Sequence, residues 1–109
     1  MPQDLAKAVP LHVAASVVHQ QLSGSLQEAD ERYAAVLNST ALALSHVADI
    51  YYVDAHGRNV KIPAEELALG LFESGAKLFR TRSGNVYESL SMRRDDLADA
   101  IVILKKARG

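Results

Sequence analysis

The sequence contains no cysteine and no tryptophan, and only three of its 109 residues are proline. The lack of cysteine excludes disulfide scaffolds, thiolate zinc sites and cysteine nucleophiles. No apolar run approaches the ~18 residues that a membrane-spanning helix requires, and the first residues lack the apolar stretch of a signal peptide. We therefore expect a cytoplasmic protein that makes no contact with a membrane.

Catalytic signatures are missing as well. The chain has no Gly-x-Ser-x-Gly elbow, no Walker loop and no dinucleotide-binding fingerprint. The acidic pairs Glu65–Glu66 and Asp95–Asp96 are adjacent residues, which do not face each other on a helix and so do not form an acid/base dyad. Both pairs begin predicted helices, where their charge complements the helix dipole. We therefore expect neither enzymatic activity nor a cofactor.

The four histidines do not have the spacing of a metal site. His12 and His19 lie two helical turns apart, ~10 Å along the axis, whereas ligands on one helix are three or four residues apart. His46 ends a predicted helix, and His56 lies in a predicted turn. The sequence therefore predicts no bound metal.

Composition indicates a single globular domain. Hydrophobic residues make up 49% of the chain and charged residues 23%, with a formal net charge of -1, which is not the composition of a disordered chain. The 17 alanines and 14 leucines favour helices. We expect one domain over residues 1–109, in which residues 1–9 form a flexible lead-in.

The first half of the chain has the apolar spacing of helices. Apolar residues three and four apart predict helices over residues 10–22 and 25–47. Ser25 and Glu28 have the spacing of a capping box at the start of the second helix, and Gly24 suits the end of the first.

After Asp49 the apolar period falls to two, which is typical of strands. Residues 50–53 and 59–62 predict a hairpin joined by a type I turn from Asp54 to Gly57. One face of this hairpin is apolar and consists of Ile50, Tyr52, Val60 and Ile62.

A short crossover helix is predicted to begin at Pro63, with Gly75 just past its end. A second hairpin then runs from Lys77 to Met92, with its register set by a two-residue turn at Gly84 and Asn85. That turn places Phe79 opposite Leu90, Thr81 opposite Glu88, Arg80 opposite Ser89 and Arg82 opposite Tyr87. The alternative, a three-residue loop, pairs Arg82 with Val86 and Phe79 with Ser89, which mixes apolar and polar side chains on both faces. The crossover helix should bury Leu67, Ala68, Leu71 and Phe72.

A final helix begins near Asp95 or Asp96 and ends in Lys105, Lys106 and Arg108, whose charges match the helix dipole. The order of elements predicts an α+β fold. Two N-terminal helices precede two β-hairpins that form one four-stranded antiparallel sheet, with a crossover helix and a C-terminal helix.

Aromatic and basic residues share one face of this predicted sheet. They are Tyr51, Lys61, Arg80, Arg82 and Tyr87. We interpret this face as the surface that binds a partner. The leading hypothesis is a small non-catalytic interaction domain, regulatory or adaptor-like, that binds another protein.

The alternative is single-stranded nucleic acid bound on the same face, since aromatic rings stack on bases and cations neutralise phosphates. The helices at 10–22 and 96–106 each show more apolar surface than one packing contact needs, and such surfaces often mark interfaces. We therefore expect a homodimer, with a monomer that buries both helices as the other interpretation.

Overall fold

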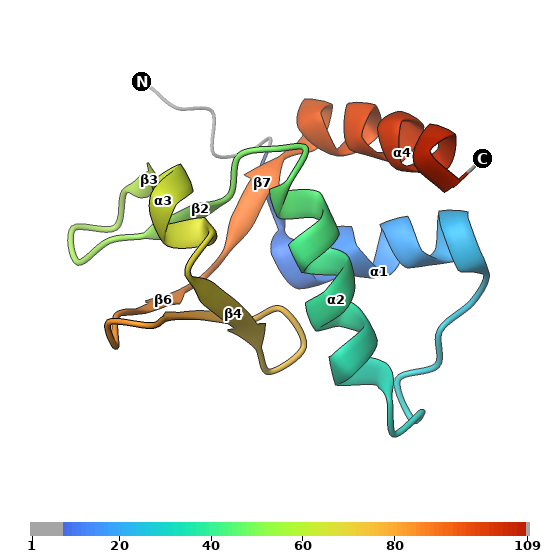
Figure 1. Cartoon of the computed structure of the whole chain (residues 1–109), viewed down its shortest axis with the longest axis horizontal. Helices are drawn as coiled ribbons and strands as arrows, with labels where there is room; N and C mark the ends of the chain where they lie inside the picture. The colour runs from blue at the N-terminus through green and yellow to red at the C-terminus, as the bar shows by residue number, and fades with distance from the viewer. Residues whose placement is uncertain (1–7, 109) are drawn as a thin grey trace.

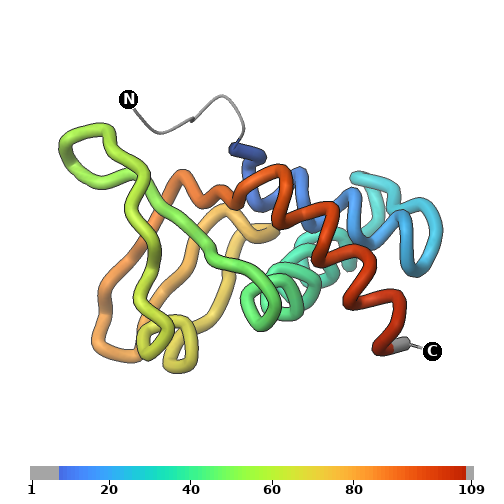
Figure 2. Tube along the Cα trace, turned by 90° about the horizontal axis from the view of Figure 1, so that it is seen from above, coloured from blue at the N-terminus to red at the C-terminus, as the bar shows by residue number. Residues whose placement is uncertain are grey.

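The computed structural model describes residues 8–108, and within that range the chain forms four helices and two antiparallel sheets (Figure 1). The predicted α+β class is therefore confirmed. Helices α1, α2 and α4 gather at one end of the molecule and the hairpins at the other (Figure 2). None of the described helices is long and apolar enough to cross a membrane. The helices are α1 (Leu11–Ser23), α2 (Tyr33–Ser45), α3 (Ala64–Leu67) and α4 (Arg94–Arg108).

The strands divide between two sheets, so the prediction of one sheet built from both hairpins is wrong. The four-stranded sheet has the order β1-β7-β2-β3, and the three-stranded sheet has the order β4-β5-β6. The first comprises β1 (Ala8–Pro10), β7 (Ser91–Arg93), β2 (Tyr51–Val53) and β3 (Asn59–Lys61). The second comprises β4 (Gly70–Glu73), β5 (Leu78–Thr81) and β6 (Val86–Glu88).

The lead-in predicted over residues 1–9 ends in β1. Ala8 and Val9 belong to this strand and pair with Arg93 and Met92 of β7. The rest of the predicted lead-in, residues 1–7, lies outside the described residues. The helix predicted over 10–22 is confirmed as α1.

The second helix begins at Tyr33, eight residues later than the capping box at Ser25 predicts. The side chain of Asp30 accepts a hydrogen bond from the backbone N–H of Arg32 at 2.8 Å. Such local bonds from aspartate compete with helix formation. The chain therefore turns at Asp30 and enters α2 only at Tyr33, whose N–H donates to the Asp30 carbonyl.

The first hairpin forms as predicted. Tyr52 pairs with Val60, and the Gly57 N–H donates to the Asp54 carbonyl at 3.0 Å, which closes the turn. The Asp54 carboxylate also accepts the N–H groups of His56 and Arg58. Hydrogen bonding to the Arg58 backbone is the largest influence on Asp54 and lowers the pKa of this carboxyl below its ordinary value.

The crossover helix is much shorter than predicted. It begins after Pro63, but α3 ends at Leu67 and the chain then forms strand β4. A strand places Leu71 and Phe72 on opposite faces, and Phe72 is buried whereas Leu71 is exposed. Gly70 favours this arrangement because any Cβ there would lie 2.5 Å from the Phe79 ring.

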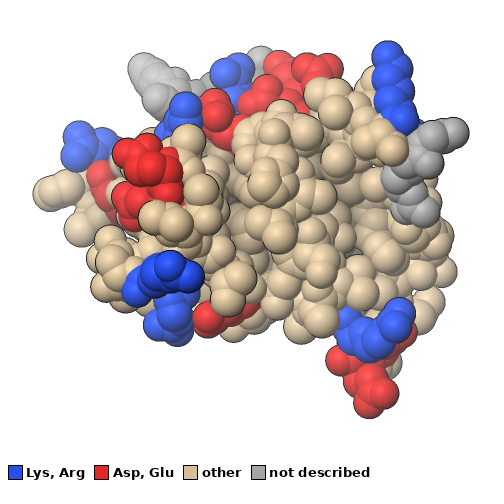
Figure 3. All heavy atoms as spheres, in the orientation of Figure 1, with Lys and Arg blue, Asp and Glu red and all other residues tan. Residues whose placement is uncertain are grey.

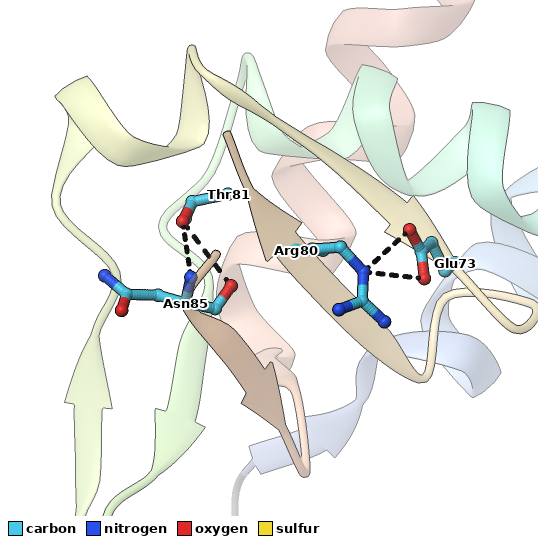
Figure 4. A network of polar contacts seen from close by, with 4 residues as sticks. All are labelled: Glu73, Arg80, Thr81 and Asn85. Atoms are coloured by element: carbon cyan, nitrogen blue, oxygen red, sulfur yellow. Dashed lines mark hydrogen bonds and ion pairs between the residues drawn. The ribbon is translucent and has the colours of Figure 1, made fainter. Parts of the chain in front are cut away.

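The second hairpin has a different register from both alternatives. Phe79 pairs with Tyr87, and Arg80 pairs with Val86, so the predicted pairs of Phe79 with Leu90 and Arg82 with Tyr87 are wrong. The Thr81 hydroxyl accepts the Asn85 N–H at 3.0 Å and donates to the Asn85 carbonyl at 3.4 Å (Figure 4). The Thr81 N–H also donates to that carbonyl. These bonds close a three-residue loop over residues 82–84. This loop begins one residue earlier than the loop of the three-residue alternative.

The second strand of this hairpin is also interrupted. Ser89 has a positive φ of 53°, and after it the chain leaves the three-stranded sheet and forms β7 in the four-stranded sheet. The Leu90 carbonyl then accepts the N–H of Leu11 at 2.9 Å, which joins this corner to the start of α1.

The turn between β4 and β5 is fixed to α2 by one side chain. Three successive residues, Ser74, Gly75 and Ala76, have positive φ, which is costly for the two that carry a Cβ. The Asn38 side-chain oxygen accepts the N–H of buried Ala76 at 2.7 Å. This bond satisfies a donor that the unusual turn would otherwise leave buried without a partner.

One core joins the helices and both sheets. Its buried side chains come from α1, α2, α4 and from strands or flanking residues of each sheet. Its largest fully buried members are Phe79, Leu11, Leu37, Leu44, Ile50, Ile62, Met92 and Val18.

Replacing Asn38 with alanine should leave the Ala76 N–H without its acceptor. We expect the free energy of unfolding to fall by about 1–3 kcal/mol, the usual cost of an unsatisfied buried donor, measured by urea denaturation. The matched control is Ser25→Ala in the exposed segment before α2, which should change stability by less than about 0.5 kcal/mol. Equal stabilities of the two variants would contradict this role of Asn38.

Candidate functional site

The five residues of the predicted partner surface do not lie on one face. Tyr51 and Lys61 are brought together, because they are direct cross-strand partners in the four-stranded sheet. The Lys61 ammonium also lies 3.5 Å from the Asp49 carboxylate. This pair is therefore one small part of the predicted surface.

The two arginines lie on the other sheet. Arg80 belongs to β5, and its Nε lies 3.2 Å from a carboxylate oxygen of Glu73 on β4 (Figure 4). Arg82 lies in the loop after β5, and its N–H donates to the Leu69 carbonyl at 2.8 Å. Both arginines are exposed.

Tyr87 is half-buried between the two sheets. Its ring centroid lies 4.5 Å from that of Tyr52 and 6.5 Å from that of Phe79, and its hydroxyl donates a hydrogen bond to Glu66. That bond is the main reason why the pKa of Tyr87 is raised to about 12, and desolvation adds to it. Tyr87 therefore joins the sheets, with its ring beside those of Tyr52 and Phe79.

The outer face of the three-stranded sheet was not anticipated from the sequence. Leu71 pairs with Arg80, and Arg80 with Val86, so these three side chains form one row across the sheet. Leu71 is 68% exposed, Val86 is 42% exposed, and the neighbouring Leu69 is 56% exposed. We call this surface the Leu71 face and define it by Leu69, Leu71, Glu73, Leu78, Arg80, Val86 and Glu88.

A period of two in the sequence could have revealed this face. Leu69, Leu71 and Glu73 alternate with Gly70 and Phe72, which is the pattern of a strand with one exposed side. The same segment also fits a helix through Leu67, Ala68, Leu71 and Phe72. The helical interpretation assigned Leu71 to the core, so an exposed face was not predicted.

A second surface contains no Lys, Arg, Asp or Glu. The middle of the face in Figure 3, where α2 lies in Figure 1, shows neither basic nor acidic atoms, and α2 contains no Lys, Arg, Asp or Glu. We call it the α2 surface and define it by the exposed residues Ala35, Ser39, Leu42 and His46.

The helices that were expected to carry surplus apolar surface differ from each other. Helix α1 buries Leu11, Ala14, Ala15 and Val18 in the monomer and contacts α2, α4 and β7. On α4, Val102 and Ile103 remain 54% and 46% exposed. Most of the apolar surface of α1 is therefore accounted for within one chain.

No group of three His, Asp or Glu side chains within residues 8–108 is placed to hold a metal ion. Comparisons with protein families, with curated proteins and with solved structures found no match.

The Tyr87–Glu66 contact gives a titration that can be measured. Glu66→Gln removes the charge while keeping an acceptor oxygen, so we expect the pKa of Tyr87 to fall from about 12 towards 10.0. Because folding raises this pKa, the stability it contributes is present below pH 10 and is lost as pH rises through 12. Ultraviolet titration of the phenolates measures the shift.

The control is Tyr51→Phe, which removes a tyrosine from the other side of the four-stranded sheet. This variant should leave the titration step of Tyr87, near pH 12, in place. If Glu66→Gln leaves that step unchanged, the assignment of this contact to the raised pKa is wrong.

Proposed function

We propose that this chain is a non-catalytic interaction domain, regulatory or adaptor-like, that binds another protein through the Leu71 face. The observation that carries the proposal is the row in which exposed Leu71 and Val86 flank Arg80. Side chains as exposed as Leu71 gain ~25 cal/mol for each Å² of apolar area that a partner covers.

Arg80 suits the centre of such a contact. Arginine is enriched at protein interfaces because its planar guanidinium donates several hydrogen bonds and its stem packs on apolar groups. Here the side chain is half-exposed and held towards Glu73, so its orientation is partly fixed before a partner arrives. A partner with an acidic group beside an apolar patch would complement this row.

The alternative, single-stranded nucleic acid, has weaker support. The Tyr, Arg and Lys residues on which it depends belong to two sheets, and the Tyr87 ring packs against Tyr52. Stacking of bases requires open aromatic faces. The two functions also differ in salt dependence, because binding through phosphates weakens steeply as salt is added.

The sequence led us to expect a homodimer through the helices at 10–22 and 96–106, and we propose instead that a homodimer forms through the α2 surface. A twofold contact brings the same patch onto itself, so a charged residue near the axis would face its own copy. The α2 surface avoids this repulsion because α2 has no charged side chain, and Leu42 is 42% exposed at its centre. Ala35 and Ser39 are small enough for two helices to approach closely.

The Leu71 face is tested with Leu71→Asp combined with Arg80→Glu. We expect the double variant to bind the partner at least about tenfold more weakly, which is usual for removal of central apolar and arginine contacts. Wild type and variant would be used to capture proteins from native extract at low salt, with and without nuclease. The affinity of any protein captured stoichiometrically would then be measured with purified components.

The matched control is Val102→Asp, which adds an acid at an exposed apolar residue of α4 and should bind like the wild type. Circular dichroism checks that both variants are folded. Capture that disappears with nuclease would favour the nucleic-acid alternative, and equal capture by the double variant would contradict the Leu71 face.

The dimer is tested by sedimentation velocity at micromolar and higher concentrations. We expect the wild type to sediment as a dimer and Leu42→Asp to sediment as a monomer, because the substitution places two carboxylates near the axis. Ile103→Asp, the control on α4, should remain dimeric. A monomeric wild type would contradict the dimer without affecting the proposal for the Leu71 face.

A further inference from the structure

A cavity of about 330 Å³ lies beside the four-stranded sheet, at the low end of the volumes of small-molecule sites. Pro10 pairs with Ser91, Ser91 with Tyr51, and Val53 with Asn59, so the strand residues of its wall share one side of the sheet. The turn after β4 supplies the opposite wall. The lining residues are Ala8, Pro10, His12, Val53, Asn59, Ala76, Lys77, Ser89, Leu90 and Ser91.

One buried hydroxyl in this lining has no hydrogen-bond partner. The Ser91 oxygen is buried, and it is the only buried side-chain N or O atom without a partner among the described residues. Its neighbour across the sheet is Pro10, which has no N–H to offer. Folded proteins satisfy nearly all buried polar groups, and an exception calls for a partner that is not part of the chain.

Among residues 8–108, the ionisable side chains of the lining are those of Lys77 and His12, and no Asp or Glu of this range lines the cavity. By contrast, Arg58, Lys61 and Arg80 each lie against a carboxylate of this chain. An anion in the cavity would therefore meet the Lys77 ammonium and neutral donors, with no competing carboxylate from the described residues.

The remaining wall is apolar. It consists of Ala8, Pro10, Val53, Ala76 and Leu90. A bare inorganic anion would leave these groups without contact, whereas a molecule with a hydrocarbon body would cover them. The lining thus combines an anion-binding side with an apolar side.

Two wall residues hold backbone conformations that are rare for residues with a Cβ. Ala76 and Ser89 have φ values of 71° and 53°. The Ala76 conformation is fixed by the bond from its N–H to Asn38. The cavity is thereby shaped before a ligand binds, which lowers the entropic cost of binding.

We propose that this cavity binds a small carboxylate with an apolar body. The Lys77 ammonium attracts the carboxylate, the Ser91 hydroxyl donates a hydrogen bond to the ligand, and Val53 and Leu90 contact its hydrocarbon part. The cavity shares no residue with the Leu71 face or the α2 surface. Failure of ligand binding here would therefore leave the proposed function unaffected, and the reverse also holds.

The probe is sodium butyrate, added to the isotopically labelled full chain and followed by amide NMR at constant ionic strength. We expect saturable shifts at the amides of Asn59, Lys77 and Ser89, with none at Leu42. Butyramide, which has the same shape without the charge, should bind at least about tenfold more weakly because it lacks the charge-assisted contact.

Two variants test the roles of the lining. Lys77→Met keeps the length of the side chain and should weaken butyrate binding about tenfold, whereas Lys106→Met on α4 should leave it unchanged. Ser91→Ala should weaken binding without lowering the melting temperature, because it removes a buried hydroxyl that has no partner in the free protein.

The proposal is overturned if butyrate gives no saturable shifts, if the shifts map outside the lining, or if butyramide binds as tightly as butyrate. Unchanged affinity in Lys77→Met would remove the cationic side of the site. A Ser91→Ala variant that loses stability but keeps its affinity would show that the hydroxyl acts only in folding.

Discussion

The left-handed backbone of Ser89 lets the chain leave one sheet and enter the other within two residues. Both sheets depend on this corner, because β6 before it completes the three-stranded sheet and β7 after it is an inner strand of the four-stranded sheet. Leu90 is fixed there by the N–H of Leu11. With the two sheets held in this way, the rings of Tyr52 and Tyr87 meet between them.

A second constraint, the bond from Ala76 to Asn38, attaches the β4–β5 hairpin to α2. This hairpin serves two surfaces. Its strands carry Leu71 and Arg80 on the open face of the sheet, and its turn brings Ala76 and Lys77 to the cavity beside the other sheet. The fold therefore places two candidate binding surfaces on one hairpin while keeping their residues separate.

Much of the fold follows from local signals in the sequence. Helix α1 and the hairpin over residues 50–62 form as predicted because their patterns agree with their turn residues, and α4 begins at Arg94, next to the predicted start. The segment after Pro63 could not be assigned in this way. Leu71 fits both a helical stripe and a strand, and the contact of Phe79 with Gly70 that decides for the strand joins different elements.

The candidate site was only partly predictable for the same reason. Arg80 and Arg82 lie on or beside the Leu71 face, but Tyr87 lies between the sheets because the loop after Thr81 shifts the register. That loop is closed by the Thr81 hydroxyl, a side-chain bond that turn statistics do not include. A register shift by an odd number of residues exchanges the two faces of a strand. Tyr87 therefore lies on the opposite face of the sheet from Arg80, and the predicted surface does not form.

The pairing of β1 with β7 has a consequence for how the molecule is made. It joins segments near the two ends of the described chain, so the loop that must close is almost as long as the domain itself. Contacts between such distant segments slow folding, since the entropy of closure is lost before the contacts form. During synthesis, the four-stranded sheet stays incomplete until β7 has left the ribosome, and Met92 reaches the core only then.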